Sequence, residues 1–111
     1  MDPGAFVATS DQLQAALTAL AENRVDDARR EFERVLASQP DNAAALHWTA
    51  VIAYQQGTAP DAVLGQIERA IALDDGQALF HNSRGALPYA MGRDLEAVES
   101  FHRAVQLSDR S

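Results

Sequence analysis

Residues 85–104 read Gly85-Ala-Leu-Pro-Tyr-Ala-Met-Gly92-Arg-Asp-Leu-Glu-Ala97-Val-Glu-Ser-Phe101-His-Arg-Ala104, and this stretch decides the fold. Its pattern is typical of two antiparallel helices that pack closely around a tight turn. Small residues at Gly85, Ala97 and Ala104 allow the two backbones to approach. Gly92 stands where the chain must reverse, and we expect a positive φ there, which glycine tolerates. Phe101 is predicted to fill the space between the helices.

The same pattern occurs twice more upstream. The turn residue recurs as Asn23, Gly57 and Gly92, which are 34 and 35 positions apart. The second-helix position recurs as Ala28, Val63 and Ala97, which are 35 and 34 positions apart. The extra residue therefore falls after Gly57, in the predicted turn from Gly57 to Pro60. A helix–turn–helix unit that repeats about every 34 residues indicates a stacked helical array.

This array resembles the tetratricopeptide repeat (TPR) family, which favours small residues, a turn glycine, an aromatic residue and a closing proline at fixed repeat positions. The third repeat matches at Gly85, Gly92, Ala97, Phe101 and Ala104, the second at Ala50, Gly57 and Ala70, and the first at Ala16, Ala28, Phe32 and Pro40. Asn23 departs from the turn glycine, but asparagine also accepts the left-handed conformation. The resemblance implies an all-α, right-handed superhelix of three antiparallel helix hairpins, six helices in total. The repeats would span about 9–42, 43–77 and 78–109, within a domain at 9–109 preceded by a tail or vector-derived remnant at 1–8.

Capping residues predict where the helices begin. Thr9 and Gln12 have the spacing of a capping box, so we expect the first helix to start at Thr9. The later helix starts are predicted at Asp26, at Asp41 or Asn42, at Thr58 or Pro60, and at Asp94. Pro88 lies inside the fifth helix, expected at about 77–91, and predicts a kink near residues 84–88 or an early loosening of the helix, because proline removes a backbone hydrogen bond.

Composition narrows the possible functions. The formal net charge of −7 argues against nucleic acid or an anionic membrane as a partner. Cysteine is absent, so disulfides, thiol nucleophiles and cysteine metal sites are excluded. No run of about 18 apolar residues is present, nor a secretory signal pattern, so we expect a cytoplasmic location. All nine cationic side chains are arginine, which we interpret as the composition of a GC-rich bacterial genome.

The resemblance also implies where a partner would bind. In TPR arrays the first helix of each pair lines a concave groove, and the inward positions here are largely apolar or aromatic. The candidate groove residues are Leu13, Leu17, His47, Val51, Tyr54, Leu79, Asn82 and Tyr89. His47 and Asn82 are expected to be polar handles. The positions that hold an acidic chaperone tail in some relatives are uncharged here, so that ligand is not expected.

The sequence offers few candidate residues for catalysis or metal binding. The three histidines lack an accompanying carboxylate pattern, and no serine lies in a nucleophile-elbow or triad context, so we expect no enzyme activity, metal or cofactor. The sequence also contains no capping helix after the third repeat, which predicts either a piece of a longer protein or a second copy covering that end. We therefore expect a protein-interaction module that binds a peptide or helix of a partner. The alternatives are a self-associating scaffold, through its uncapped ends, and the recruiting domain of a larger enzyme such as a bacterial glycosyltransferase.

Overall fold

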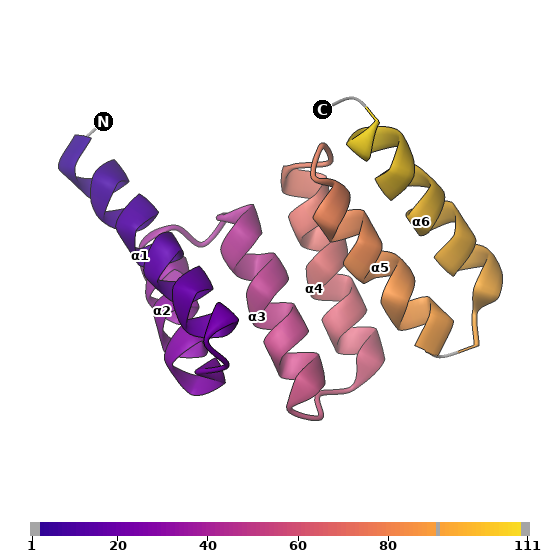
Figure 1. Ribbon diagram of the computed structural model, residues 1–111, viewed down its shortest axis with the longest axis horizontal. Coiled ribbons are helices and arrows are strands. Elements are labelled where there is room, and N and C mark those ends of the chain that lie inside the picture. Colours follow the sequence, from indigo (N-terminus) through magenta and orange to yellow (C-terminus); the bar gives the residue numbers. More distant parts are fainter. Residues whose placement is uncertain (1–2, 91, 110–111) are drawn as a thin grey trace.

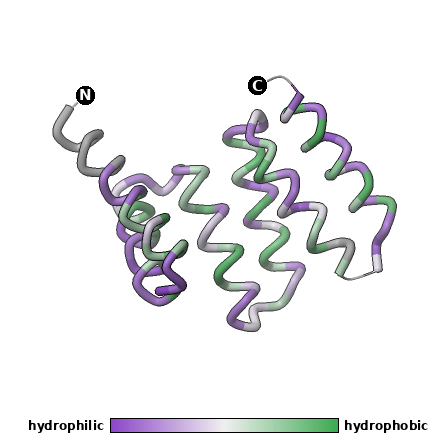
Figure 2. The backbone as a smooth tube through the Cα atoms, viewed as in Figure 1, coloured by the Kyte–Doolittle hydropathy of each residue, from purple (hydrophilic) through white to green (hydrophobic). Residues whose placement is uncertain are grey.

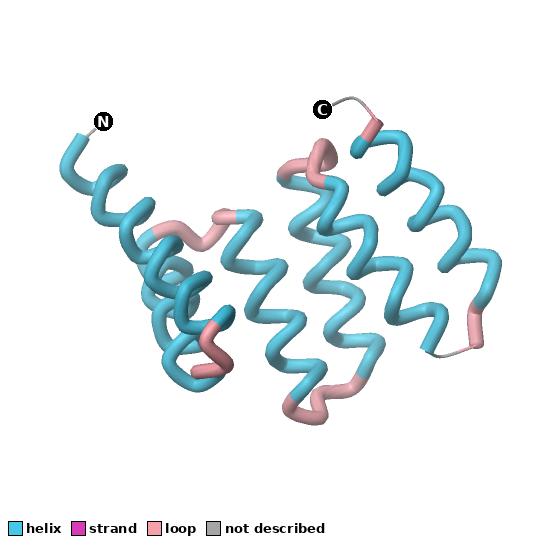
Figure 3. The backbone as a smooth tube through the Cα atoms, viewed as in Figure 1, coloured by secondary structure: helices cyan, strands magenta, loops and turns pink. Residues whose placement is uncertain are grey.

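A computed structural model describes residues 3–90 and 92–109 of the chain, and these residues form six helices joined by short loops (Figure 1, Figure 3). The helices are α1 Pro3–Ala21, α2 Val25–Ser38, α3 Ala43–Gln55, α4 Pro60–Leu73, α5 Ala78–Ala90 and α6 Asp94–Ser108. Each helix packs against the next one along the chain. The predicted all-α array of three hairpins is confirmed, with the α1–α2 pair at one end and α6 at the other.

The three hairpin turns have the predicted backbone conformation. Asn23 has a φ of 62°, Gly57 of 96° and Gly92 of 76°, all in the left-handed region. The loop from α3 to α4 holds four residues, 56–59, whereas the loop from α1 to α2 holds three, 22–24. The extra residue therefore lies where the repeat spacing placed it.

Gly85 provides the close approach between α5 and α6. A Cβ atom added at Gly85 would lie 2.8 Å from two carbons of the Phe101 ring, so a larger residue would force that ring to move. Arg84 strengthens the same contact, because it donates a hydrogen bond to Ser100 Oγ at 2.6 Å and pairs with Glu68 of α4 at 3.2 Å. The predicted packing of Phe101 over Gly85 is confirmed.

Two predicted helix starts agree with the structure. Asn42 precedes α3, and its side-chain oxygen accepts a hydrogen bond from the backbone N–H of Ala45 at 3.0 Å. Pro60 is the first residue of α4. A backbone N–H at this position would have no acceptor within the helix, so proline costs no helical hydrogen bond there.

Three predicted helix starts are wrong. α1 begins at Pro3, so Thr9 lies inside the helix and does not start it. Arg24 and Arg93 precede α2 and α6, and neither makes a side-chain capping hydrogen bond. Asp26 and Asp94 lie instead in the first turns, where a negative charge interacts favourably with the helix dipole.

Pro88 does not end α5 early. The helix continues through this position to Ala90, so the expected loosening does not end it before that residue. The side chain of Pro88 lies outside the described part of the structure, and the predicted kink stays a prediction.

The core runs between the helices as three apolar clusters of small and branched side chains. The first lies among α1, α2 and α3, and the other two lie among α3, α4 and α5. Their largest buried members are Phe32, Val35, Ile52, Ile67 and Phe80. Figure 2 shows that α3 and α4 are coloured mainly hydrophobic, whereas α2 is mainly hydrophilic.

Candidate functional site

The candidate groove residues come from the first helix of each hairpin. Leu17, Tyr54 and Leu79 are exposed to 38%, 41% and 45%, values unusual for large apolar or aromatic side chains. Asn82 is exposed, and Leu13 and Val51 are half-buried. We call these six residues the groove face. The side chain of Tyr89 lies outside the described part of the structure.

A small apolar hollow lies among α3, α4 and α5, and two residues of this face line it. Its volume is about 120 Å³, and its walls are Val51, Tyr54, Val63, Ile67, Ser83, Ala86 and Leu87. Two of the predicted groove residues, Val51 and Tyr54, therefore meet at one site. Leu13 lines a different hollow, beside Pro40 and Ala44.

Several lining residues were not among the site candidates of the sequence. Val63 and Ile67 belong to the buried stripe of α4; they are only 2% and 1% exposed, yet they form part of the wall of the hollow. Ser83 lies four residues after Leu79 and three before Ala86, so its helical spacing already placed it on the same face of α5.

His47 does not lie on the groove surface. Its side chain is fully buried, so the prediction of an exposed polar handle at this position is wrong. The imidazole lies between two rings, with centroid distances of 4.8 Å to Trp48 and 4.7 Å to Phe80. Its Nε2 is 2.7 Å from Ser83 Oγ, a hydrogen bond that joins α3 to α5 directly beside the hollow.

Burial makes His47 difficult to protonate. Its Nδ1 atom is buried and has no hydrogen-bond partner among the described residues. A second N–H on the ring would therefore be desolvated without an acceptor, which is unfavourable. Desolvation lowers the pKa of His47 from 6.5 to about 4. The residue is therefore a neutral structural link at pH 7.

The groove face carries no charged residue. The ion pairs among the described residues lie on the loops and the second helices, as in Arg69 with Asp41, and at Arg84 of α5, which pairs with Glu68 of α4. Among the described residues no three His, Asp or Glu side chains gather closely enough to hold a metal ion. None of the described helices has the length and hydrophobicity needed to span a membrane.

Comparison with known proteins identifies the family. The sequence profile of the tetratricopeptide repeat matches residues 13–78, which is more than half of the chain. The chain belongs to the tetratricopeptide repeat family. No curated protein sequence is a match.

Solved TPR structures share the fold. An O-GlcNAc transferase of Thermobaculum terrenum, solved as the K341M mutant, is 29% identical with a TM-score of 0.87 over 96% of this chain. A MamA structure is 20% identical with a TM-score of 0.70 over 92% of the chain. The type III secretion translocator chaperone SycD of Yersinia enterocolitica is 14% identical with a TM-score of 0.74 over 89%. The TPR chain described here spans 20%, 58% and 74% of those proteins' chains, respectively.

The family carries a general function. TPR domains commonly mediate protein–protein interactions and are generally non-catalytic. Because many unrelated partners bind the same fold, the identity of the ligand has to be argued from the surface of this particular chain.

Proposed function

We propose that this TPR domain is a non-catalytic module that binds a peptide or helix of a partner protein along the groove face. The observation that carries the proposal is the uncharged apolar hollow between α3 and α5, in a chain whose net charge is −7. A face that exposes Leu17, Tyr54 and Leu79 and contains no charged residue of its own suits an apolar ligand better than an acidic or basic one.

The hollow suits a single apolar anchor side chain of the partner. Its volume of about 120 Å³ is close to the ~150 Å³ of an apolar protein cavity that accepts a benzene-sized molecule. Burying such a side chain contributes about 1.5–3 kcal/mol, so one anchor accounts for roughly a tenfold to hundredfold change in affinity. Ser83 is the polar group of the wall, and its hydroxyl is already held by His47.

A displayed library of random peptides tests the proposal. We expect the selected peptides to be rich in apolar residues. Their affinity, measured by fluorescence anisotropy, should be at least tenfold lower for the Val51→Glu and Tyr54→Ala variants than for the wild type. Ala72→Glu places the same new charge on an exposed site of α4 and is the matched control, so it should leave affinity unchanged. Peptides that bind Val51→Glu as tightly as the wild type would contradict binding at the groove face.

A second candidate function is that of the recruiting domain of a larger bacterial glycosyltransferase. The similarity to the Thermobaculum terrenum O-GlcNAc transferase, at 29% identity over 96% of this chain, supports this candidate. The mass of the protein isolated from its native cells tests this candidate. A mass near 12.0 kDa would contradict it, and a mass several times larger is expected.

A further inference from the structure

Ser83 of α5 stands between a buried histidine and the hollow. Its side chain is half-buried, and its Oγ atom lies 2.7 Å from Nε2 of His47 on α3. Ser83 is also one of the residues that line the hollow. A hydroxyl group carries one hydrogen to donate and two lone pairs that accept. The direction of the hydrogen bond with His47 therefore decides what the hydroxyl still offers to a bound ligand.

The other ring nitrogen of His47 decides that direction. A distance of 2.7 Å fits either group as the donor. Nδ1, however, is buried and has no hydrogen-bond partner among the described residues. A buried N–H without an acceptor is rarer in proteins than a buried acceptor without a donor, and it loses its full hydration energy. The neutral ring therefore carries its hydrogen on Nε2 and donates it to Ser83 Oγ.

The two rings that flank His47 do not change this assignment. Trp48 meets the imidazole edge-on at a centroid distance of 4.8 Å, and Phe80 stacks on it at 4.7 Å. An aromatic ring is a much weaker acceptor for an N–H group than an oxygen atom is. Neither ring therefore replaces the acceptor that a hydrogen on Nδ1 would need.

The hydroxyl hydrogen of Ser83 is then left without an acceptor among the described residues. The one hydrogen bond of Ser83 there is with His47, whose N–H occupies a lone pair of Oγ. Thr49 on α3 shows the usual alternative for a helical hydroxyl, because it donates to the main-chain oxygen of Ala45 at 2.6 Å. Ser83 makes no such bond in the described structure, so its hydrogen remains available at the wall of the hollow.

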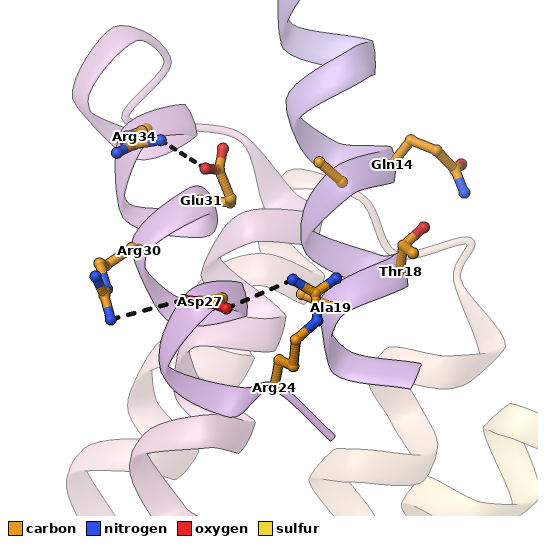
Figure 4. Close-up of a pocket in the computed structure, with 9 residues that line it drawn as sticks. Gln14, Thr18, Ala19, Arg24, Asp27, Arg30, Glu31 and Arg34 are labelled. Carbon is orange, nitrogen blue, oxygen red and sulfur yellow. Dashed lines mark hydrogen bonds and ion pairs between the residues drawn. The ribbon is translucent and has the colours of Figure 1, made fainter. Parts of the chain in front are cut away.

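The polar cleft between α1 and α2 is the opposite case. Its charged side chains hold one another in ion pairs, and Asp27 lies 3.5 Å from Arg24 and 3.6 Å from Arg30 (Figure 4). Arg34 pairs with Glu31 in the same cleft. A ligand that bound these arginines would have to displace their carboxylate partners, whereas the hollow presents its hydroxyl without a competing acceptor among the described residues.

We propose that Ser83 is the hydrogen-bond donor that determines which anchor side chain the hollow accepts. The anchor is a neutral, mainly apolar side chain that carries a hydrogen-bond acceptor, as threonine and methionine do. The acceptor pairs with the hydroxyl of Ser83, while the rest of the anchor packs against Val51, Ile67 and Leu87. This inference rests on the proposed function of the groove face and adds the chemical class of the anchor.

Other anchors satisfy the hollow less well. A hydrocarbon side chain would exclude water from the hydroxyl of Ser83 and offer it no acceptor, and a side chain that only donates would leave the same hydrogen unpaired. A carboxylate would lose its hydration at a site lined by no charged residue, in a chain whose net charge is −7. Tyr54 carries the other hydroxyl of the wall, but Tyr54 is 41% exposed, so water can remain its partner.

The nitrogen chemical shifts of the His47 ring at pH 7 test the tautomer without any substitution. We expect Nε2 to show the shift of a ring nitrogen that carries hydrogen and Nδ1 to show that of a bare nitrogen. His47→Gln identifies the signals by their loss. A hydrogen on Nδ1 would overturn the proposal, because Ser83 would then donate to His47 and have no hydrogen left for a ligand.

Matched peptides test the class of anchor. A peptide selected for binding at the groove face is made with threonine or valine, and with methionine or norleucine, at its anchor position. Ser83→Ala should lower the affinity ratio within each pair by about twofold to about tenfold, the contribution of one neutral hydrogen bond. Ser83→Thr keeps the hydroxyl and should keep the ratio. Each variant is first shown to fold by its helical circular dichroism, and Ser83→Cys, a weaker donor, takes the place of an unfolded Ser83→Ala.

The outcomes separate this inference from the proposed function. An affinity ratio that is unchanged when the donor of Ser83 is removed or weakened would overturn the inference. The function of the groove face would still stand in that case if Val51→Glu continued to abolish binding. Peptides that bind Val51→Glu as tightly as the wild type would instead overturn both.

Discussion

Acidification should destabilise this protein through His47. Between pH 7.5 and 4.5 the unfolded chain gains a proton at this position near its ordinary pKa of 6.5, while the folded chain resists protonation until its pKa of about 4. The unfolded state therefore binds more protons over this interval, and the free energy of unfolding falls as the pH falls. The contribution of His47 is fully present above pH 6.5 and is lost progressively toward pH 4.

The size of this loss follows from the two pKa values. Each unit of difference corresponds to about 1.4 kcal/mol, and at pH 4.5 most of the interval between 6.5 and 4 has been crossed. The expected loss is about 2.5 kcal/mol, a large fraction of the roughly 5–15 kcal/mol that stabilises a small domain. The cause is structural. The ring is fully buried between Trp48 and Phe80, and a second N–H at its Nδ1 atom would have no hydrogen-bond acceptor among the described residues.

Urea denaturation of the wild type and His47→Gln at both pH values measures this contribution. Glutamine does not titrate, and its amide can still donate a hydrogen bond toward Ser83. The carboxylates and the other two histidines are the same in both proteins, so their contributions cancel in the difference. We expect the wild type to lose about 2.5 kcal/mol more than the variant between pH 7.5 and 4.5. His102→Gln, at an exposed site on α6, is the control and should follow the wild type.

Equal pH dependence in the wild type and His47→Gln would refute this reasoning. It would mean that the imidazole is solvated, or that it finds an acceptor for its second proton, and that the burial of His47 does not control its protonation. The chemical shifts of the His47 ring across the same pH range report the folded-state pKa directly, and in either case they would show a pKa well above 4.

Further predictions concern packing, turns and caps. Gly85→Ala should destabilise the wild type, because the added Cβ would lie 2.8 Å from the Phe101 ring. In a Phe101→Ala background the ring is gone, so the higher helix propensity of alanine should make the same substitution stabilising by up to about 1 kcal/mol. A thermal double-mutant cycle measures this change of sign. Gly57→Ala should lower the free energy of unfolding by about 1–2 kcal/mol because of its φ of 96° alone, since nothing lies within 4 Å of the added Cβ. Asn23→Gly should change the stability little in the same melting assay, because glycine also accepts the φ of 62°. Asn42→Ala should cost about 1 kcal/mol in urea denaturation by removing the cap of α3.

The hairpins were predictable because each turn depends on a single backbone property. A residue that accepts a positive φ was needed at three regularly spaced positions, and Asn23, Gly57 and Gly92 supply it. The contact between Gly85 and Phe101 follows in the same way from one small and one large residue on facing helices. The start of α1 was missed, because Thr9 and Gln12 have capping-box spacing but lie within a helix that begins at Pro3. A capping pattern permits a helix end and does not require one.

The site was less predictable because burial depends on neighbours from other repeats. Leu13, His47 and Asn82 occupy the same repeat position, yet one is half-buried, one fully buried and one exposed. The difference at His47 arises from two large rings, Trp48 beside it and Phe80 on α5, which cover the imidazole. Repeat spacing gives a residue its direction from the helix axis. It does not give the size of the side chains that reach it from the following hairpin.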